Sequence, residues 1–231
     1  MSTDDLIQRL TSDLQPVRRL RPVAVRVAGW FVVALASLGL VMVLMGVRRE
    51  LGDAADRADF AIEAALLIVT ALSAAVGALM VSIPGADRGK LVRSLPIVIG
   101  TTTIVWALGE LLMASATGAP TGRVTFAWHC VYKTASVAAI PSVMLFVMIK
   151  RAAPLHAARA GFLAILATAA VGVLGANIIC PNDRPLHMLL WHAAPLMLFA
   201  ALGAGLGTWL LRWKADEVPP LSGGKMSAPL R

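Results

Sequence analysis

The sequence predicts an all-α polytopic membrane protein with six transmembrane helices and both termini in the cytoplasm. Of its 231 residues, 58% are hydrophobic and only 15% are charged, whereas soluble domains have about 25% charged residues. The apolar residues form blocks of about 20, the length that crosses a bilayer as a helix. A transmembrane barrel would need alternating segments of about 10 residues, which are absent. We expect the six spans at residues 24–46, 61–82, 97–116, 130–149, 160–179 and 189–211.

The distribution of Lys and Arg predicts the orientation of these spans. Fourteen basic residues lie in the N-terminal segment, in the loops after the second and fourth spans, and in the C-terminal tail. The other loops carry five, namely Arg48, Arg49, Arg57, Arg123 and Arg184. Because basic loops stay in the cytoplasm, both termini are expected on the cytoplasmic side of the membrane. The net charge of +8 then reflects loop placement, and we expect no direct contact with nucleic acid.

Three regions follow from this topology. Residues 1–22 form a cytoplasmic N-terminal amphipathic segment, residues 23–213 the six-helix transmembrane domain, and residues 214–231 a disordered cytoplasmic tail rich in proline and glycine. The lipid bilayer therefore surrounds most of the chain. There is no room for a separate soluble domain.

The N-terminal segment is expected to form a short helix over residues 3–15. Ser2 or Thr3 can cap it, and two aspartates in its first turn favour the helix dipole. Such a helix either lies on the inner leaflet or docks its apolar stripe into a groove on a cytoplasmic partner. The acidic and apolar side chains concerned are Asp4, Asp5, Leu6, Ile7, Leu10 and Leu14.

Two charged residues are expected inside the membrane. Glu110 lies in the third span and Lys133 in the fourth, each one to two turns from the outer end. Both are costly in lipid unless they are paired or hydrated. Because they lie at similar depth on consecutive helices, we expect an ion pair that fixes helix register. An ion or proton pathway is the alternative interpretation.

Thiols and imidazoles gather near the predicted outer face, at the start of the fourth span and between the fifth and sixth. Pro181 and Pro185 are expected to keep the second of these segments from continuing as helix. The gathered side chains are Cys130, Cys180, His129, His187 and His192.

Three roles are open for Cys130 and Cys180. A disulfide would close a loop of about 50 residues and contribute roughly 4 kcal/mol by chain entropy. With the histidines, the thiols could instead bind a soft metal ion such as zinc or cadmium, or hold a heavy-metal ion transiently. A thiol beside histidine and arginine can also acquire a lowered pKa and react with oxidants. Catalytic dithiol exchange is disfavoured because there is no CxxC motif, so neither an enzyme nor a resident cofactor is predicted.

These segments occur together in one six-span chain: Thr3-Asp4-Asp5-Leu6-Ile7, Trp128-His129-Cys130, and the stretch from Cys180-Pro181 to Trp191-His192. In these features the chain resembles the NrsF family of bacterial inner-membrane anti-sigma factors, up to about residue 213. The resemblance implies that the protein holds an extracytoplasmic-function sigma factor at the cytoplasmic face and keeps it from RNA polymerase. It also implies that Cys130 and Cys180 sense heavy metals or oxidants. We infer in addition that the N-terminal helix contacts the sigma factor.

Two other functions fit part of the pattern. A small transporter or exporter of metal or other ions would use the outer Cys and His residues together with Glu110 and Lys133 as a pathway. A membrane oxidoreductase would use the two thiols for turnover with a quinone or thiol substrate. Measurements of flux and of turnover separate these from a regulator.

Overall fold

The computed structural model describes residues 2–12, 20–83, 90–152 and 154–211, with the backbone alone for 9, 10, 54 and 90–93. Every regular element in this part of the chain is helical. Six helices are long and apolar enough to cross a bilayer, which confirms the predicted number and the approximate positions of the spans. Five of these are, or lie within, α2 (Val23–Met45), α4 (Ala58–Val81), α5 (Lys90–Thr117), α6 (Trp128–Lys150) and α7 (Ala157–Ile179), and the sixth runs over Pro185–Leu210 and ends in α9 (Ala194–Leu210).

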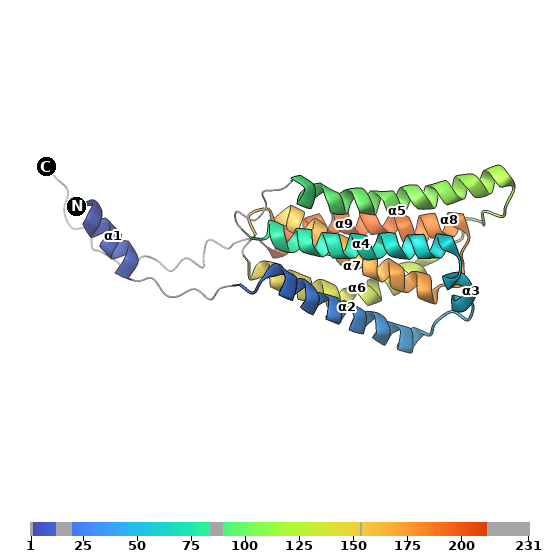
Figure 1. Cartoon of the computed structure of the whole chain (residues 1–231), viewed down its shortest axis with the longest axis horizontal. Coiled ribbons are helices and arrows are strands. Elements are labelled where there is room, and N and C mark those ends of the chain that lie inside the picture. Colours follow the sequence, from blue (N-terminus) through green and yellow to red (C-terminus); the bar gives the residue numbers. More distant parts are fainter. Residues whose placement is uncertain (1, 13–19, 84–89, 153, 212–231) are drawn as a thin grey trace.

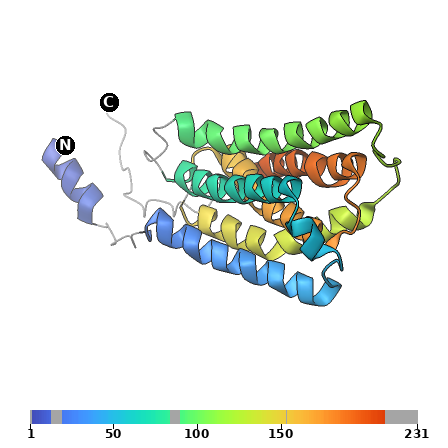
Figure 2. The same ribbon diagram turned by 45° about the vertical axis from the view of Figure 1, so that its right-hand side comes forward.

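The long helices run alternately up and down in one bundle (Figures 1 and 2). The start of α2 and the end of α9 therefore lie at the same end, which we call the terminal end. The ends of α5 and α7 and the start of α6 lie at the opposite end, which we call the distal end (Figure 1). Three short elements occupy the distal end: α3 (Leu51–Ala55), α8 (Pro185–Met188) and a π-helical turn, η1 (Leu189–Ala193).

Helix α7 is the centre of the bundle. It packs mainly against α9, α4 and α6, and its most apolar 18-residue window is 78% buried, against 17% for the window of α5. Its sequence is rich in alanine and glycine, which lets neighbouring backbones approach closely. α5 packs mainly against α4 and exposes most of its surface. The distal end of α7 is consequently the most enclosed position on that face.

Glycines make the closest of these contacts, and Gly203 and Gly207 of α9 have the GxxxG spacing that is typical of close helix packing. A Cβ added to Gly207 would lie 2.9 Å from the Cα of Gly161 on α7. One added to Gly175 would lie 2.9 Å from side-chain carbons of Leu38 and Val137. Both distances are shorter than a real Cβ contact, so neither position has room for a larger residue. The GxxxG pair of α9 thus fixes the distance between α7 and α9.

A proline inside α6 organises the seam between α2 and α6. Pro141 has no N–H, so it cannot donate to the carbonyl of Val137 one turn earlier. The hydroxyl of Ser37 on α2 donates to that carbonyl at 2.8 Å. The indole N–H of the fully buried Trp30 donates to the carbonyl of Pro141 at 3.2 Å. Ser37 and Trp30 of α2 therefore fix the position of α6 along α2, and α6 is the helix that carries Cys130.

The sixth span begins earlier than predicted, and one expectation about its prolines is wrong. Pro185 does not keep the chain from forming helix; it is the first residue of α8, the position where a missing N–H costs nothing. The helix then continues through η1, where the N–H of Ala194 bonds to the carbonyl of Leu189, five residues back. Pro195 follows directly and has no N–H to offer to a regular α-helical bond.

The N-terminal helix α1 (Thr3–Ser12) is drawn apart from the bundle in Figure 1. The backbone N–H of Asp5 donates to the hydroxyl of Ser2 at 3.2 Å, which confirms the predicted N-cap. The side chains of Leu6 and Ile7 are exposed. Residues 13–15 of the predicted helix, Leu14 included, lie outside the described residues, as does the tail 214–231.

Candidate functional site

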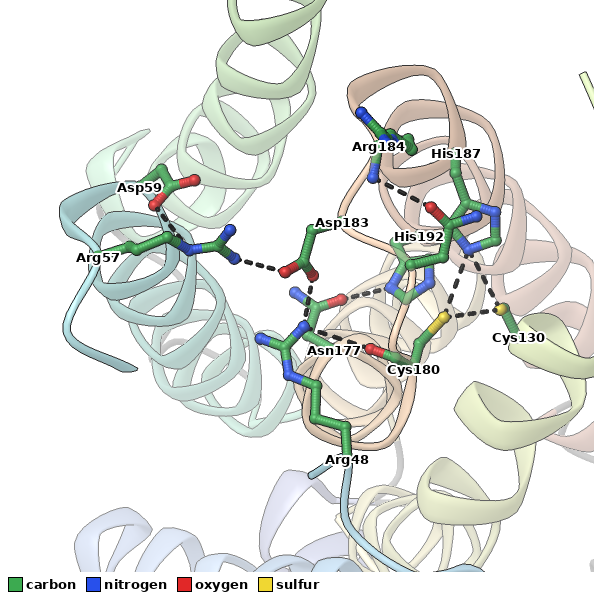
Figure 3. A network of polar contacts seen from close by, with 11 residues as sticks. Arg48, Arg57, Asp59, Cys130, Asn177, Cys180, Asp183, Arg184, His187 and His192 are labelled. Atoms are coloured by element: carbon green, nitrogen blue, oxygen red, sulfur yellow. Dashed lines mark hydrogen bonds and ion pairs between the residues drawn. The ribbon is translucent and has the colours of Figure 1, made fainter. Parts of the chain in front are cut away.

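Four thiol and imidazole side chains meet at the distal end of the bundle (Figure 3). Cys130 comes from the first turn of α6, and Cys180 ends α7, where its N–H bonds to the carbonyl of Ala176 at 2.7 Å. His187 lies in α8 and His192 in η1. All four side chains are buried, and one donor atom from each lies within 4.8 Å of the others. We call this group the thiol–imidazole cluster.

The two cysteines are close but not bonded. Their Sγ atoms are 3.6 Å apart, and both are free thiols, whereas a disulfide bond is about 2.04 Å long. Cys130 is 4% exposed and Cys180 5% exposed. Both cysteines therefore lie at one end of the bundle, as predicted, and both are free thiols in the structure.

The histidines complete the cluster from one side. His187 Nε2 lies 3.4 Å from the Sγ of Cys130 and 3.5 Å from that of Cys180. The rings of His187 and His192 are 5.3 Å apart between centroids. In a regular α-helix two residues five apart would point about 140° away from each other. The π turn brings them onto one face, in keeping with the frequent occurrence of such turns at functional sites.

Polar groups from α7 and two loops hold the cluster in place. The Nδ1 of His192 is hydrogen-bonded to the side-chain oxygen of Asn177, one turn before the end of α7. The buried guanidinium of Arg48 donates to the carbonyl of Cys180 at 3.3 Å and pairs with Asp183. Arg57 also pairs with Asp183, at 2.5 Å. The loop that follows Cys180 is thus bound to Arg48, which comes after the end of α2, and to Arg57, which comes before the start of α4.

Hydrogen bonds around this loop shift the pKa values of Cys180 and Arg57. The hydrogen bond with Cys130 lowers the pKa of the Cys180 thiol, and His187 adds to this effect against burial, which raises it. The hydrogen bond with Asp183 raises the pKa of the Arg57 guanidinium. The distal loop therefore favours a negative sulfur at Cys180 and a positive charge at Arg57.

Other predicted residues lie elsewhere. His129 is exposed and stacks on Trp128, with ring centroids 4.3 Å apart, so it does not belong to the cluster. No ion pair joins Glu110 and Lys133 in the part of the chain that the structure describes. The reason is that α5 packs mainly on α4 while α6 packs on α7 and α2, so α5 and α6 are not close neighbours. Glu110 instead lines a small polar pocket with Glu63.

Sequence reasoning missed three supporting residues. The distribution of basic residues identifies Arg48 and Arg57 only as loop charges, and the hydropathy pattern includes Asn177 in an apolar span. The available signal was the position of Asn177, a lone amide in an otherwise apolar helix three residues before a cysteine. A polar group at such a place needs a partner, and here the partner is His192.

The fold and the cluster define a class: a helical protein of multi-pass membrane type, with a buried pair of reduced thiols and two imidazoles at one end of its bundle. The chain matches the family described as negative regulator of sigma F, NrsF, over residues 10–213, and it belongs to that family. The match ends at residue 213, as the resemblance predicted, and it begins at residue 10, after the Thr3–Ile7 segment. A family of anti-sigma factors implies a sigma factor as partner.

One curated relative supports this assignment. The chain is 27% identical to a protein from Azospira oryzae named "Probable anti-sigma-F factor NrsF". The alignment spans 222 residues and covers 92% of this chain and 100% of that protein. No solved structure matches the chain.

Proposed function

We propose that this protein captures an extracytoplasmic-function sigma factor at the cytoplasmic face of the bacterial inner membrane and releases it when Cys130 and Cys180 meet an oxidant or a heavy metal. One observation carries the proposal. In a chain of an anti-sigma family, two reduced, buried thiols lie 3.6 Å apart at the bundle end opposite to the start of α2 and the end of α9. Signal and output are thus assigned to opposite ends.

The loop charges support this orientation. The terminal end carries the basic loops, with fourteen Lys and Arg residues against five at the distal end, and basic loops stay in the cytoplasm. The thiol–imidazole cluster then faces the periplasm. Oxidants and metal ions reach that compartment before they reach the cytoplasm.

Helix α1 is the proposed contact for the sigma factor. Its side chains of Leu6 and Ile7 are 42% and 53% exposed and are therefore free to enter an apolar groove on a partner. Asp4 and Asp5 are exposed beside them and suit a basic partner better than an anionic leaflet. We assign Leu10 and Leu14 to the same contact because they continue the spacing of the stripe.

The signalling step follows from the sulfur geometry. With a two-electron oxidant such as hydrogen peroxide, the two thiols lose two protons and two electrons, an S–S bond forms, and the peroxide becomes two molecules of water. The sulfur atoms must approach from 3.6 Å to about 2.04 Å. This draws the start of α6 toward the end of α7. Because those helices pack closely through Gly172 and Gly175, the shift is passed along the bundle as a change between two packed states.

The distribution of buried polar groups favours a regulator over a transporter. Among the described residues, the buried polar side chains in the middle of the bundle are hydroxyls such as Ser37, Thr70 and Thr168. Transporters bind substrate near the midplane with broken helices and charged or amide groups. Buried acids, amides and imidazoles are found here only toward the distal end, within the described part.

Co-purification tests the proposal. The full chain in detergent should retain one of the extracytoplasmic-function sigma factors encoded in the same genome. Leu6→Asp should abolish retention, and Gln8→Ala, on the same helix outside the apolar stripe, should not. Retention of no sigma factor would refute the proposed function, and retention by Leu6→Asp would refute the assigned contact.

A further inference from the structure

The four donor atoms of the thiol–imidazole cluster lie within 4.8 Å of one another, close enough to surround a single ion. They come from Cys130, Cys180, His187 and His192. We infer that these four side chains form a closed, four-coordinate site that holds a resident soft divalent cation, of which Zn²⁺ is the common example. This inference goes beyond the proposed function and does not depend on sigma-factor capture.

The distances agree with such a site. Zinc bound at about 2.3 Å to sulfur and about 2.05 Å to nitrogen places its ligands roughly 3.8 Å apart for two sulfurs and roughly 3.6 Å apart for sulfur and nitrogen. The observed Sγ–Sγ distance is 3.6 Å. The distances from His187 Nε2 to the two sulfurs are 3.4 and 3.5 Å. These three ligands therefore fit the ion with displacements of a few tenths of an ångström, and the His192 donor atom lies within 4.8 Å of them.

His192 supplies an independent observation. The residue is 0% exposed, and its Nε2 has no hydrogen-bond partner in the part of the chain that the structure describes. An unpaired buried nitrogen is costly. Its Nδ1 is hydrogen-bonded to the oxygen of Asn177, which requires the proton on Nδ1 and leaves a lone pair on Nε2. This is the usual arrangement of a metal-binding histidine, whose second nitrogen donates to an outer oxygen.

The charges also balance. Binding releases the two thiol protons to solvent, so two thiolates and two neutral imidazoles surround a doubly charged cation with no net charge. A neutral site can be buried without the penalty of an isolated ion. Because four protein ligands fill the coordination sphere, the site suits a structural or signalling role and leaves no position for substrate.

Such an ion would join three segments of the chain at the distal end: the starts of α6 and of the last span, and the end of α7. It would also protect the two thiols from premature disulfide formation in an oxidising compartment. A competing thiophilic metal would replace the ion at these four ligands, and oxidation of the two thiols would release it.

Metal counting on the full chain tests the inference. The detergent-purified protein is stripped with a chelator under reducing conditions, loaded with Zn²⁺, desalted and measured by mass spectrometry. We expect about one zinc per chain and, after loading with Co²⁺, the visible absorption bands of a tetrahedral site with thiolate ligands. His192→Ala should weaken zinc affinity at least about 100-fold, beyond the roughly 10- to 100-fold loss expected for outer partners. His129→Ala is the matched control and should bind like wild type.

Asn177 gives a second test that does not remove a ligand. Asn177→Ala should weaken zinc binding by roughly 10- to 100-fold, whereas Asn177→Asp, which keeps an oxygen for the Nδ1–H of His192, should restore it. Helical content and monodispersity are checked for each variant, so a failure to fold is recognised. Absence of stoichiometric zinc and of the tetrahedral cobalt spectrum in folded wild-type protein would overturn the inference. Equal loss in His129→Ala and His192→Ala would overturn the assigned ligands.

Discussion

The hydrogen bond from Ser37 to the carbonyl of Val137 is predicted to matter only because Pro141 is present. A proline has no N–H, so the carbonyl one turn earlier lacks its helical donor, and Ser37 on the neighbouring helix supplies one at 2.8 Å. Ser37→Ala leaves this buried carbonyl unpaired. When Pro141 is also replaced by alanine, the new N–H can bond to the carbonyl and the serine becomes dispensable.

The expected magnitude follows from that geometry. An unpaired buried group costs about 1–3 kcal/mol, while interhelical hydrogen bonds in membrane proteins average about 0.6 kcal/mol and reach about 1.7. We therefore expect Ser37→Ala to lower the free energy of unfolding by about 1 kcal/mol. In the Pro141→Ala background the same substitution should cost less than about 0.3 kcal/mol, which gives a coupling energy near 0.7 kcal/mol.

Reversible unfolding in mixed micelles of a mild detergent and a denaturing one measures this cycle. The four proteins are wild type, Ser37→Ala, Pro141→Ala and the double variant. Ser136→Ala is the control, since this exposed hydroxyl bonds within its own helix, at 2.9 Å to the carbonyl of Tyr132. Its effect should stay within about 0.5 kcal/mol. Additive effects of the Ser37 and Pro141 substitutions would show that the serine does not replace the missing N–H.

Three further outcomes are expected. Gly207→Leu should prevent or strongly weaken folding of the bundle, because a Cβ at this position meets backbone atoms of the N-terminal residues of α7. Gly205→Leu is the control and should fold normally in the same thermal unfolding assay, because a Cβ at Gly205 has no atom from outside its own helix within 4 Å. Asp183→Asn should lower the free energy of unfolding by about 3 kcal/mol, because it leaves a buried guanidinium without its counterion; a loss below about 1 kcal/mol would refute that estimate. In chelator-treated protein, the hydrogen bond with Cys130 lowers the pKa of the Cys180 thiol, so this sulfur should ionise below the usual 9.0. Thiolate absorbance should follow this titration, and Cys130→Ala, which removes the largest cause, should move it back toward 9.0.

Hydropathy predicted the six spans because a bilayer imposes one length on every crossing helix. It also placed Cys130 and Cys180 at one end of the bundle, since counting crossings assigns each loop to a face. Packing between helices has no such simple rule. The expected pairing of Glu110 with Lys133 assumed that α5 and α6 touch, whereas α5 packs mainly on α4, and α6 packs on α7 and α2.

The details of the cluster depended on local geometry that the sequence does not display plainly. His129 is adjacent in sequence to Cys130, yet neighbouring residues on a helix point about 100° apart, so it faces outward when Cys130 faces inward. His192 joins the cluster through a π turn that no apolar period reveals. Arg48 reaches the cluster from a loop more than 130 residues away in sequence, and only the tertiary fold brings it there.

The affinity for the sigma factor, measured with and without a reaction at the distal thiols, tests most directly whether the two ends of the bundle are coupled. The full chain is placed in lipid nanodiscs, and binding of the labelled sigma factor is titrated before and after treatment with hydrogen peroxide or Cd²⁺. We predict that treatment weakens binding by about tenfold or more, within the range of known allosteric couplings. The double variant Cys130→Ser, Cys180→Ser should bind the sigma factor but show no change. Equal weakening in the wild type and the double variant, or none in either, would contradict thiol-based release.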